Sequence, residues 1–221
     1  GVTIAEREDE LKSAVDSALS CSFGHEAIIE EYIEGNEISV EFISYKGEHY
    51  PLQITDKVTT GAPHFVELEH HQPAVLNREQ RLQINNLTIK ALNALGVTNG
   101  ASHSEYKITK DGRVIVMEIG ARMGGDFIGS DLVRLSTGYD YLKGVIEVAI
   151  GAFEKPVFGA SHYSGVYFLC DETKYLKTII QETKMPQIIR ADITNIEMQK
   201  VTCSADRSGY LIYQCDEKLR L

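Results

Sequence analysis

Apolar residues recur three and four positions apart in two segments of the chain, which is the period of a helix with one buried face. Residues 6–20 show this period and begin with acidic side chains, which stabilise the first turn of a helix. Residues 78–95 are predicted to form a second helix that ends at Gly96. Asn77 and Gln80 have the spacing of a capping box and mark its start.

Shorter runs of apolar and β-branched residues predict strands. In the first half of the chain the predicted strands are 1–4, 27–33, 37–43 and 49–55. Residues 56–76 interrupt the pattern and are predicted to be a long irregular connection. Helical segments are expected from Gly125 to about 150. The last third has strand patterns at 162–169, 187–196 and 209–214, which predict a β-rich lobe.

A β-hairpin is predicted within residues 101–125, where two alternating runs flank Asp111 and Gly112. Asp-Gly is a favoured two-residue turn, and with that turn Glu105 faces Glu118. Like charges on directly opposed residues destabilise a strand pair. The predicted opposition of the two carboxylates is therefore unfavourable unless another group or ion relieves the repulsion.

Strand alternation divides the hairpin into two faces. The apolar face, expected to pack on the core, carries Ser104, Tyr106, Ile108, Ile115, Met117 and Ile119. The other face carries His103, Glu105, Lys107 and Glu118. The polar groups of the hairpin are thus gathered on one side.

Three explanations fit the acidic pair. Both carboxylates point into water with Lys107 paired to one of them, or they share a proton, or they hold a hard cation such as Mg²⁺. The residues that follow favour the cation, because Arg122 and the backbone N–H groups near Gly124 and Gly125 attract phosphate or carboxylate anions.

Bulk composition excludes several classes of protein. The 221 residues are 43% hydrophobic and 24% charged with a formal net charge of −10, as expected for one large globular domain or a domain with an appendage. No apolar run approaches the roughly 20 residues of a membrane span. The acidic balance argues against a nucleic-acid partner, and four cysteines without C-x-x-C spacing favour reduced thiols in a cytoplasmic protein.

The stretch EYKITKDGRVIVMEIGARMGGD resembles the metal-binding hairpin of the ATP-grasp superfamily, whose pattern is E…E-x-N-x-R. Glu105, Glu118 and Arg122 match this pattern, and Gly120 stands where many members have Asn. The resemblance implies an α+β fold with an antiparallel sheet and flanking helices. It also implies ATP and Mg²⁺ as cofactors, with Mn²⁺ as an alternative metal, and Glu105 and Glu118 as the metal ligands.

A second segment, EEYIEGNE at 30–37, is similar to the hinge between the two lobes of that family. The resemblance assigns nucleotide binding to Glu30, Glu31, Ile33 and Glu37. Main-chain groups near Glu31 and Ile33 would bond adenine, and Glu37 would hold the ribose. Without the resemblance, the same segment is an ordinary strand, turn and strand.

Three residues are candidates for catalysis. By the resemblance, Arg122 would stabilise charge on a transferred phosphoryl group; the alternative is a surface arginine paired with Asp126. His103 shares a face with Glu105 and would border the phosphates, or else be structural. Lys57 would reach a phosphate or a substrate carboxylate, or else be a solvated lysine.

The connection 56–76 carries further polar candidates. His64 and Glu67 are candidates for the acceptor site. His70 and His71 are adjacent on an extended segment and therefore point to opposite faces, which argues against a joint metal site.

The resemblance divides the chain into a partial ATP-grasp domain at 1–152 and a C-terminal β-rich lobe at 153–221. Residues 1–3 look like the tail of the loop that covers the phosphates, so an N-terminally truncated domain is expected, with little or no activity in isolation. The parent would be an ATP- and Mg²⁺-dependent ligase, like carbamoyl-phosphate synthase or amino-acid ligases, that joins a small-molecule carboxylate to an amine. Such lobes commonly dimerise in related enzymes, so a homodimer is one possible assembly. The alternatives are a metallohydrolase that uses Glu105, Glu118 and His103 without nucleotide, and a non-catalytic nucleotide-binding module.

Overall fold

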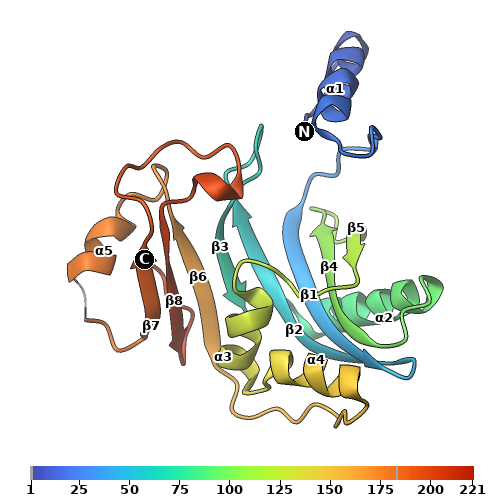
Figure 1. The fold of residues 1–221 in the computed structure, drawn as a ribbon, viewed down its shortest axis with the longest axis vertical. Helices are drawn as coiled ribbons and strands as arrows, with labels where there is room; N and C mark the ends of the chain where they lie inside the picture. The colour runs from blue at the N-terminus through green and yellow to red at the C-terminus, as the bar shows by residue number, and fades with distance from the viewer. Residues whose placement is uncertain (1, 183) are drawn as a thin grey trace.

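Eight strands form one antiparallel sheet in the computed structural model, which describes residues 2–182 and 184–221. They are β1 (Asn36–Tyr45), β2 (Glu48–Thr59), β3 (Glu67–Gln72), β4 (Gly100–Ile108), β5 (Val114–Gly120), β6 (Tyr163–Leu169), β7 (Ile188–Ile193) and β8 (Gly209–Cys215). Their order across the sheet is β5-β4-β1-β2-β3-β6-β8-β7, so β5 and β7 are the edges (Figure 1). The predicted α+β class with an antiparallel sheet is confirmed.

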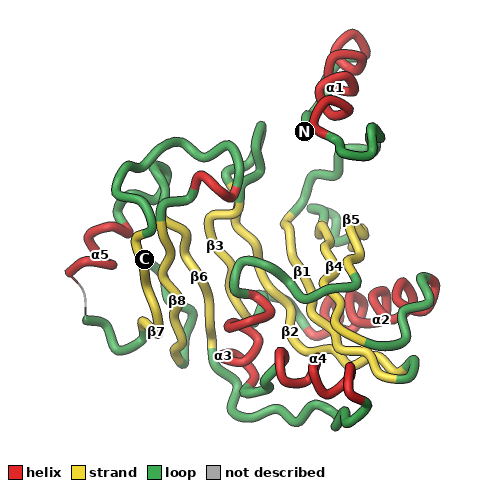
Figure 2. Tube along the Cα trace, in the orientation of Figure 1, coloured by secondary structure: helices red, strands yellow, loops and turns green. Residues whose placement is uncertain are grey.

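Helices cover both faces of this sheet (Figure 2). The covering helices are α2 (Arg78–Ala94), α3 (Val133–Thr137), α4 (Tyr141–Ile150) and α5 (Leu176–Glu182), and a π-helical turn at Ile128–Leu132 precedes α3. A further helix, α1 (Glu8–Cys21), stands apart from the sheet. Because neighbours along a strand point to opposite faces, Phe42 of β1 packs with Ile84 of α2, whereas Ile43 packs with Val148 of α4.

The face that carries α4 changes from apolar to polar along β1. Ile43 lies in the apolar part, and Glu41, Ser39 and Glu37 follow on the same face toward the start of the strand. Lys57 and Glu105 come from the strands on either side of β1. The polar half of this face is where the candidate site lies.

The helix predicted at 6–20 is confirmed as α1, which stands apart from the sheet and has no buried residue (Figure 1). The strand predicted at 27–33 is wrong: this segment is extended, and Ile28 and Ile29 are 84% and 64% exposed. A strand needs a hydrogen-bonded neighbour, and no described strand pairs with these residues. Residues 2–5 also form no strand, and position 1 lies outside the described residues.

The connection predicted at 56–76 is also wrong in large part. β2 continues to Thr59, and Glu67 begins β3, which pairs with β2 on one side and with β6 on the other. Most residues of β3 are polar, and two of them, Glu67 and His70, line the candidate site. The hydrophobic pattern that predicts most strands is therefore missing from β3. Lys57 accordingly lies on a strand and not on a loop.

The strands predicted at 162–169, 187–196 and 209–214 are confirmed as β6, β7 and β8. They continue the sheet of the first half through the β3–β6 pair, so residues 153–221 do not form a sheet of their own. Gly165 of β6 lies at this junction, where a Cβ would come within 2.6 Å of the His70 carbonyl oxygen and 2.5 Å of the Tyr213 ring. The two halves of the sheet therefore meet closely at a position that only glycine fits.

Replacing Gly165 by alanine is expected to lower the free energy of unfolding by about 1–3 kcal/mol, because backbone and rings must move apart. Urea denaturation measures the loss. Gly159→Ala is the matched control, since its Cβ would meet atoms only at 3.8 Å and beyond. Equal stability of the two variants would contradict the close packing inferred at the junction.

Candidate functional site

The loop of the β4–β5 hairpin has three residues, Lys110 to Gly112, and not the predicted two. The N–H of Thr109 donates to the carbonyl of Arg113 over 3.0 Å, which closes the loop. Gly112 has φ 84°, a left-handed value that favours glycine. Because the loop is one residue longer than predicted, the residues of β4 next to it face partners on β5 one position earlier than predicted: Ile108 faces Val114 and not Ile115.

A β-bulge then restores the predicted register at the acidic pair. Tyr106 faces Val116, one position away from the prediction. The next residue, Glu105, faces Glu118, so Met117 is the extra residue of the bulge. The predicted opposition of the two glutamates is confirmed, because the bulge cancels the shift that the loop introduces.

The same shift corrects the predicted core face. Val114 is buried among the core residues in place of Ile115. Tyr106 is fully buried, and its hydroxyl lies 2.6 Å from the Thr88 hydroxyl of α2. Lys107 pairs with neither glutamate: its ammonium donates to the Ile33 carbonyl over 3.0 Å.

Lys57 is the cation that contacts the acidic pair. Its side chain is 3% exposed, and its Nζ lies 2.7 Å from Glu105 Oε1, 2.8 Å from Glu37 Oε1 and 3.5 Å from Glu67 Oε1. Burial lowers the pKa of Lys57, but the charges of Glu105 and Glu37 outweigh it and raise the pKa above its usual value. Three carboxylates from β4, β1 and β3 thus surround one ammonium.

His103 is buried between two further carboxylates. Its Nε2 lies 3.1 Å from Glu105 Oε1, and its Nδ1 hydrogen bonds to Glu41, which is fully buried. Burial lowers the pKa of His103, but the hydrogen bonds to Glu105 and Glu41 and their charges raise it to about 9. Burial likewise raises the pKa of Glu105, and the bond from His103 and the charge of Lys57 lower it to about 2. His103 is therefore an imidazolium at neutral pH.

The glycine-rich segment after β5 is hydrogen-bonded to Glu41, the ion-pair partner of His103. The N–H of Gly124 donates to Glu41 Oε2 over 3.0 Å. A Cβ on Gly124 would lie 2.7 Å from Glu41 Oε1 and 2.8 Å from His103 Nδ1. The backbone comes this close to the carboxylate because the residue is glycine.

Asp126 connects the same segment to the C-terminal strands. Its carboxylate accepts two hydrogen bonds from Arg207, at 2.7 and 2.8 Å, and lies 3.7 Å from His70 Nε2. Burial raises the pKa of Asp126, but His70 and Arg207 lower it well below its usual range. The guanidinium of Arg207 also stacks 3.8 Å from the Phe168 ring centroid. The sequence alternative that paired Arg122 with Asp126 is wrong, because Arg207 takes that place.

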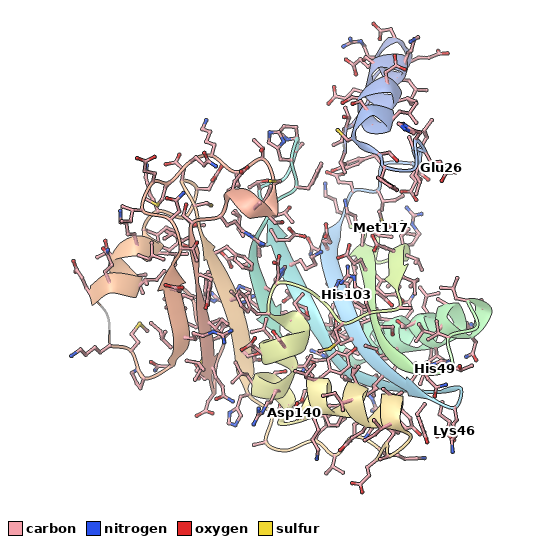
Figure 3. All side chains as sticks on the ribbon, viewed as in Figure 1. Glu26, Lys46, His49, His103, Met117 and Asp140 are labelled. Atoms are coloured by element: carbon pink, nitrogen blue, oxygen red, sulfur yellow. The ribbon has the colours of Figure 1, made fainter. Side chains whose placement is uncertain are left out.

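These groups line a cavity of about 420 Å³, within the range of small-ligand sites. Its lining residues are Lys57, Glu67, His70, His103, Glu105, Arg122, Met123, Gly125, Asp126 and Ile128. Figure 3 labels His103 near the middle of the sheet, above α4 in that view. Strands β2, β3 and β4 and the segment after β5 therefore form one polar cavity, and Arg207 contacts it through Asp126.

The structure brings together some predicted site residues and not others. Lys57, His103, Glu105 and Arg122 line the cavity, and Glu37 joins it through Lys57. Glu118 is opposite Glu105 with an exposed side chain outside the lining. Of the acceptor-site candidates, Glu67 lines the cavity and His64 is exposed outside it.

The predicted hinge lies elsewhere. Glu30 and Glu31 are exposed, and residues 31–34 line a second hollow of about 240 Å³ together with residues 109–111 and Arg113 of the hairpin loop. Lys107 holds this segment through the Ile33 carbonyl and lies 5.0 Å from the Tyr32 ring centroid.

His70 and His71 face opposite sides, as predicted. His70 lines the cavity, whereas His71 lies 2.9 Å from the Tyr213 hydroxyl and 2.7 Å from Glu69.

Sequence reasoning missed Glu41 and Arg207. A charged residue in the middle of an apolar strand that is central in its sheet was the available signal for Glu41. Arg207 has no such local signal, because its partner Asp126 lies 81 positions away along the chain.

Metal binding would rest on few protein ligands. No group of three or more His, Cys, Asp or Glu side chains among the described residues is arranged to hold a metal. Within the described residues, Glu105 Oε2 and the two oxygens of the Glu118 carboxylate have no hydrogen-bond partner, so they are available to a metal ion. One or two carboxylates supplemented by substrate phosphates are the usual ligands of Mg²⁺, so the residues fit this cation.

The chain also matches a known protein family. The sequence pattern of the ATP-grasp domain matches residues 1–131 of the chain. This chain belongs to the ATP-grasp domain family. None of the helices in residues 2–182 and 184–221 has the length and apolar character needed to cross a membrane.

Relatives of this ATP-grasp chain include ligases. It is 32% identical to alanine–anticapsin ligase of Bacillus subtilis (strain 168) over 129 residues, which cover 53% of this chain and 27% of the ligase. It is 26% identical to carnosine synthase 1 of Gallus gallus over 133 residues, or 60% of this chain and 14% of the synthase. The crystal structure of L-amino acid ligase from Bacillus licheniformis matches with a TM-score of 0.78 and 25% identity, over 98% of this chain and 58% of that chain. The matches thus span less than a third of the two curated relatives.

The His103 ion pair predicts a fall in stability with rising pH. The folded protein keeps a proton on His103 that the unfolded chain loses above about pH 6.5, so this contribution is complete below 6.5 and disappears as pH rises through about 9. Between these limits we expect the free energy of unfolding to fall by about 3 kcal/mol, measured by urea denaturation. The double variant Glu41→Gln/His103→Asn replaces the pair by amides and should lack this slope; an equal slope would contradict the assignment.

Gly124→Ala is expected to lower the free energy of unfolding by about 1–3 kcal/mol, because the new methyl group overlaps Glu41 and His103. Gly125→Ala, whose Cβ would meet nothing within 4 Å, should change it by no more than about 0.5 kcal/mol. Denaturation of both variants makes the comparison. A Gly124 variant as stable as its neighbour would show that the backbone is not held against Glu41.

Proposed function

We propose that this chain is the metal- and phosphate-binding part of an ATP- and Mg²⁺-dependent ligase that activates a carboxylate as an acyl phosphate for attack by an amine. The observation that carries the proposal is the register of β4 and β5, which sets Glu105 opposite Glu118 at a cavity lined by Arg122. The ligase names of the relatives support the reaction class. Small-molecule carboxylates and amines are the proposed substrates. The division of the chain into a partial ATP-grasp domain at 1–152 and a C-terminal lobe at 153–221 is also part of the proposal.

Glu105 and Glu118 are the proposed holders of Mg²⁺, with Mn²⁺ as an alternative of similar oxygen preference. When bound, the cation would neutralise phosphate charge and so favour phosphoryl transfer. Glu105 is ionised in the neutral range, as a ligand of a hard cation must be: burial raises its pKa, but His103 and Lys57 lower it to about 2. Gly120 adds no side-chain ligand where many relatives of the family have Asn.

Nucleotide binding is proposed for the hinge and for Glu37. Glu30, Glu31 and Ile33 lie on the extended segment before β1, whose main chain has hydrogen-bonding groups for adenine. The Ile33 carbonyl already accepts a hydrogen bond from Lys107, so the base would bond to other main-chain groups of this segment. Glu37 Oε1 is bonded to Lys57, and its other oxygen would accept from the ribose hydroxyls.

Arg122 is the proposed catalytic residue, since an exposed guanidinium at the cavity can stabilise charge that develops on the transferred phosphoryl group. His103 would act as a fixed positive charge beside Glu105 and not as a base, because it is protonated at neutral pH. Lys57 has its ammonium committed to carboxylates, so a direct phosphate contact would require Nζ to leave at least one of them.

The metallohydrolase alternative loses support from the same contacts. It needs a ring nitrogen of His103 as a metal ligand, and both nitrogens lie within hydrogen-bond distance of carboxylates. No observation favours it over the ligase.

Calorimetric titration of the full-length protein with ADP, in Mg²⁺ and in EDTA, tests the proposal. We expect binding that depends on Mg²⁺ and that weakens about tenfold or more, about 1.4 kcal/mol, in Glu105→Gln and Glu118→Gln. Glu154→Gln, an exposed acid far from the acidic pair in sequence, is the control and should bind like the wild type. Turnover is followed as phosphate release with pairs of amino acids, and the isolated 221-residue chain is expected to show little or none.

Each other outcome points to a different function. Binding of nucleotide without turnover in the full-length protein would indicate a non-catalytic module. Tight binding of a transition metal with no effect of nucleotide would favour the hydrolase and overturn the ligase proposal.

A further inference from the structure

The ammonium of Lys57 lies at the centre of four adjacent strands. Lys57 comes from β2, and its three carboxylate partners come from β4, β1 and β3, at 2.7 Å for Glu105, 2.8 Å for Glu37 and 3.5 Å for Glu67. The lysine side chain is 3% exposed, and each partner is between 22% and 25% exposed. Bulk water therefore screens the carboxylates in part and hardly reaches the ammonium.

This arrangement resolves two electrostatic problems at once. A buried ammonium without a partner is strongly unfavourable, and carboxylates that converge from neighbouring strands repel one another. One cation bonded to Glu105 and Glu37 removes both penalties. Removing Lys57 would leave Glu37 and Glu67 without an ion-pair partner among the described residues and Glu105 with His103 alone, so an excess of negative charge would remain.

The carboxylates that Lys57 holds are those proposed to bind the ligands of the site. Glu105 is the proposed metal ligand and Glu37 the proposed ribose acceptor. Lys57 uses Oε1 of each, and Oε2 of Glu105 has no hydrogen bond or ion pair within the described residues. A divalent cation could therefore bind Glu105 through Oε2 while Lys57 keeps Oε1.

We propose that Lys57 is a built-in counter-cation that positions Glu105 and Glu37 before nucleotide and metal bind. Lys57 is a positioning residue in this role: it supplies, at a fixed point of the sheet, the positive charge that a divalent cation would otherwise supply. This inference rests on the proposed function for the identity of the cation. It adds that the Lys57 ammonium takes the place of that cation in the folded protein before any ligand binds. It follows that Mg²⁺ alone has little to gain by binding the wild type, whereas loss of the Lys57 charge creates an acidic site for it.

Thermal unfolding in the absence of nucleotide tests the inference, with MgCl₂ at about 10 mM as the probe against NaCl of equal ionic strength, which controls for screening. Lys57→Gln keeps an N–H donor without the charge, and Lys57→Met removes both. We expect each to melt about 5 °C or more below the wild type in EDTA, and Mg²⁺ to restore about half of that loss. The wild type and Lys57→Arg, which keep the charge, should shift by less than about 1 °C with Mg²⁺.

Lys107→Gln is the matched control, because Lys107 lies on β4 two residues from Glu105 but donates to a carbonyl and not to a carboxylate. Its melting temperature should not respond to Mg²⁺. The double variant Lys57→Gln/Glu105→Gln should lose the response of Lys57→Gln, since it removes the proposed ligand together with the excess charge.

Equal Mg²⁺ shifts in the wild type, Lys57→Gln and Lys107→Gln would overturn the inference. So would Lys57 variants that remain unfolded when Mg²⁺ is present, whereas folding that requires Mg²⁺ would support it. The outcome is separable from that of the proposed function. Binding of ADP with Mg²⁺ to the wild type without a selective Mg²⁺ response in Lys57→Gln defeats this inference alone, and the reverse pattern defeats the nucleotide proposal alone.

Discussion

Charge neutralisation inside one face of the sheet is the constraint on which the rest of this structure depends. Glu37, Glu41 and Glu105 point from central strands into space that water only partly reaches, and each meets a positive group within hydrogen-bond distance. Lys57 serves two of them, and His103 serves Glu41 while also contacting Glu105. These ionised groups are tolerated in the interior because each of them has a partner of opposite charge. Removing one partner would leave an unpaired buried charge, which is strongly destabilising.

The same charges also position the backbone that follows the hairpin. Glu41 accepts from the N–H of Gly124, and Asp126 is held by two bonds from Arg207. One short segment is thereby tied to β1 on one side and to the chain just before β8 on the other. Arg122 belongs to this segment, so its position over the cavity depends on contacts with both halves of the sheet.

The strands β2, β3 and β4 line the site, and the second half of the sheet contacts it through Arg207 and Asp126, which affects how the site can change. The junction at β3 and β6 is tight around Gly165, and the fastening through Arg207 adds a second connection. On the edge strand β5, the exposed Glu118 makes no hydrogen bond or ion pair within the described residues, whereas its partner Glu105 is bonded to Lys57 and His103. We expect the rigid part of the site to be the wall formed by Lys57, His103 and Asp126, and the metal-facing edge to adjust to its ligand.

Elements whose causes are local could be predicted from the amino-acid sequence alone. Asn77 and Gln80 cap α2 as their spacing predicts, and strand alternation located β1, β2 and the hairpin. The opposition of Glu105 and Glu118 was predicted correctly although neither the three-residue loop nor the bulge was, because the two shifts cancel. Helix caps, turns and alternation act between residues a few positions apart, so a sequence pattern contains them.

Only the tertiary structure decided which charges meet. The partners of Lys57 come from three other strands, and Arg207 reaches Asp126 across 81 positions of chain. The strand predicted at 27–33 did not form, and the polar strand β3 formed where none was predicted, because pairing depends on the neighbour that the fold provides. Contacts of this kind follow from strand order in the sheet, and strand order is a property of the whole chain that no local pattern contains.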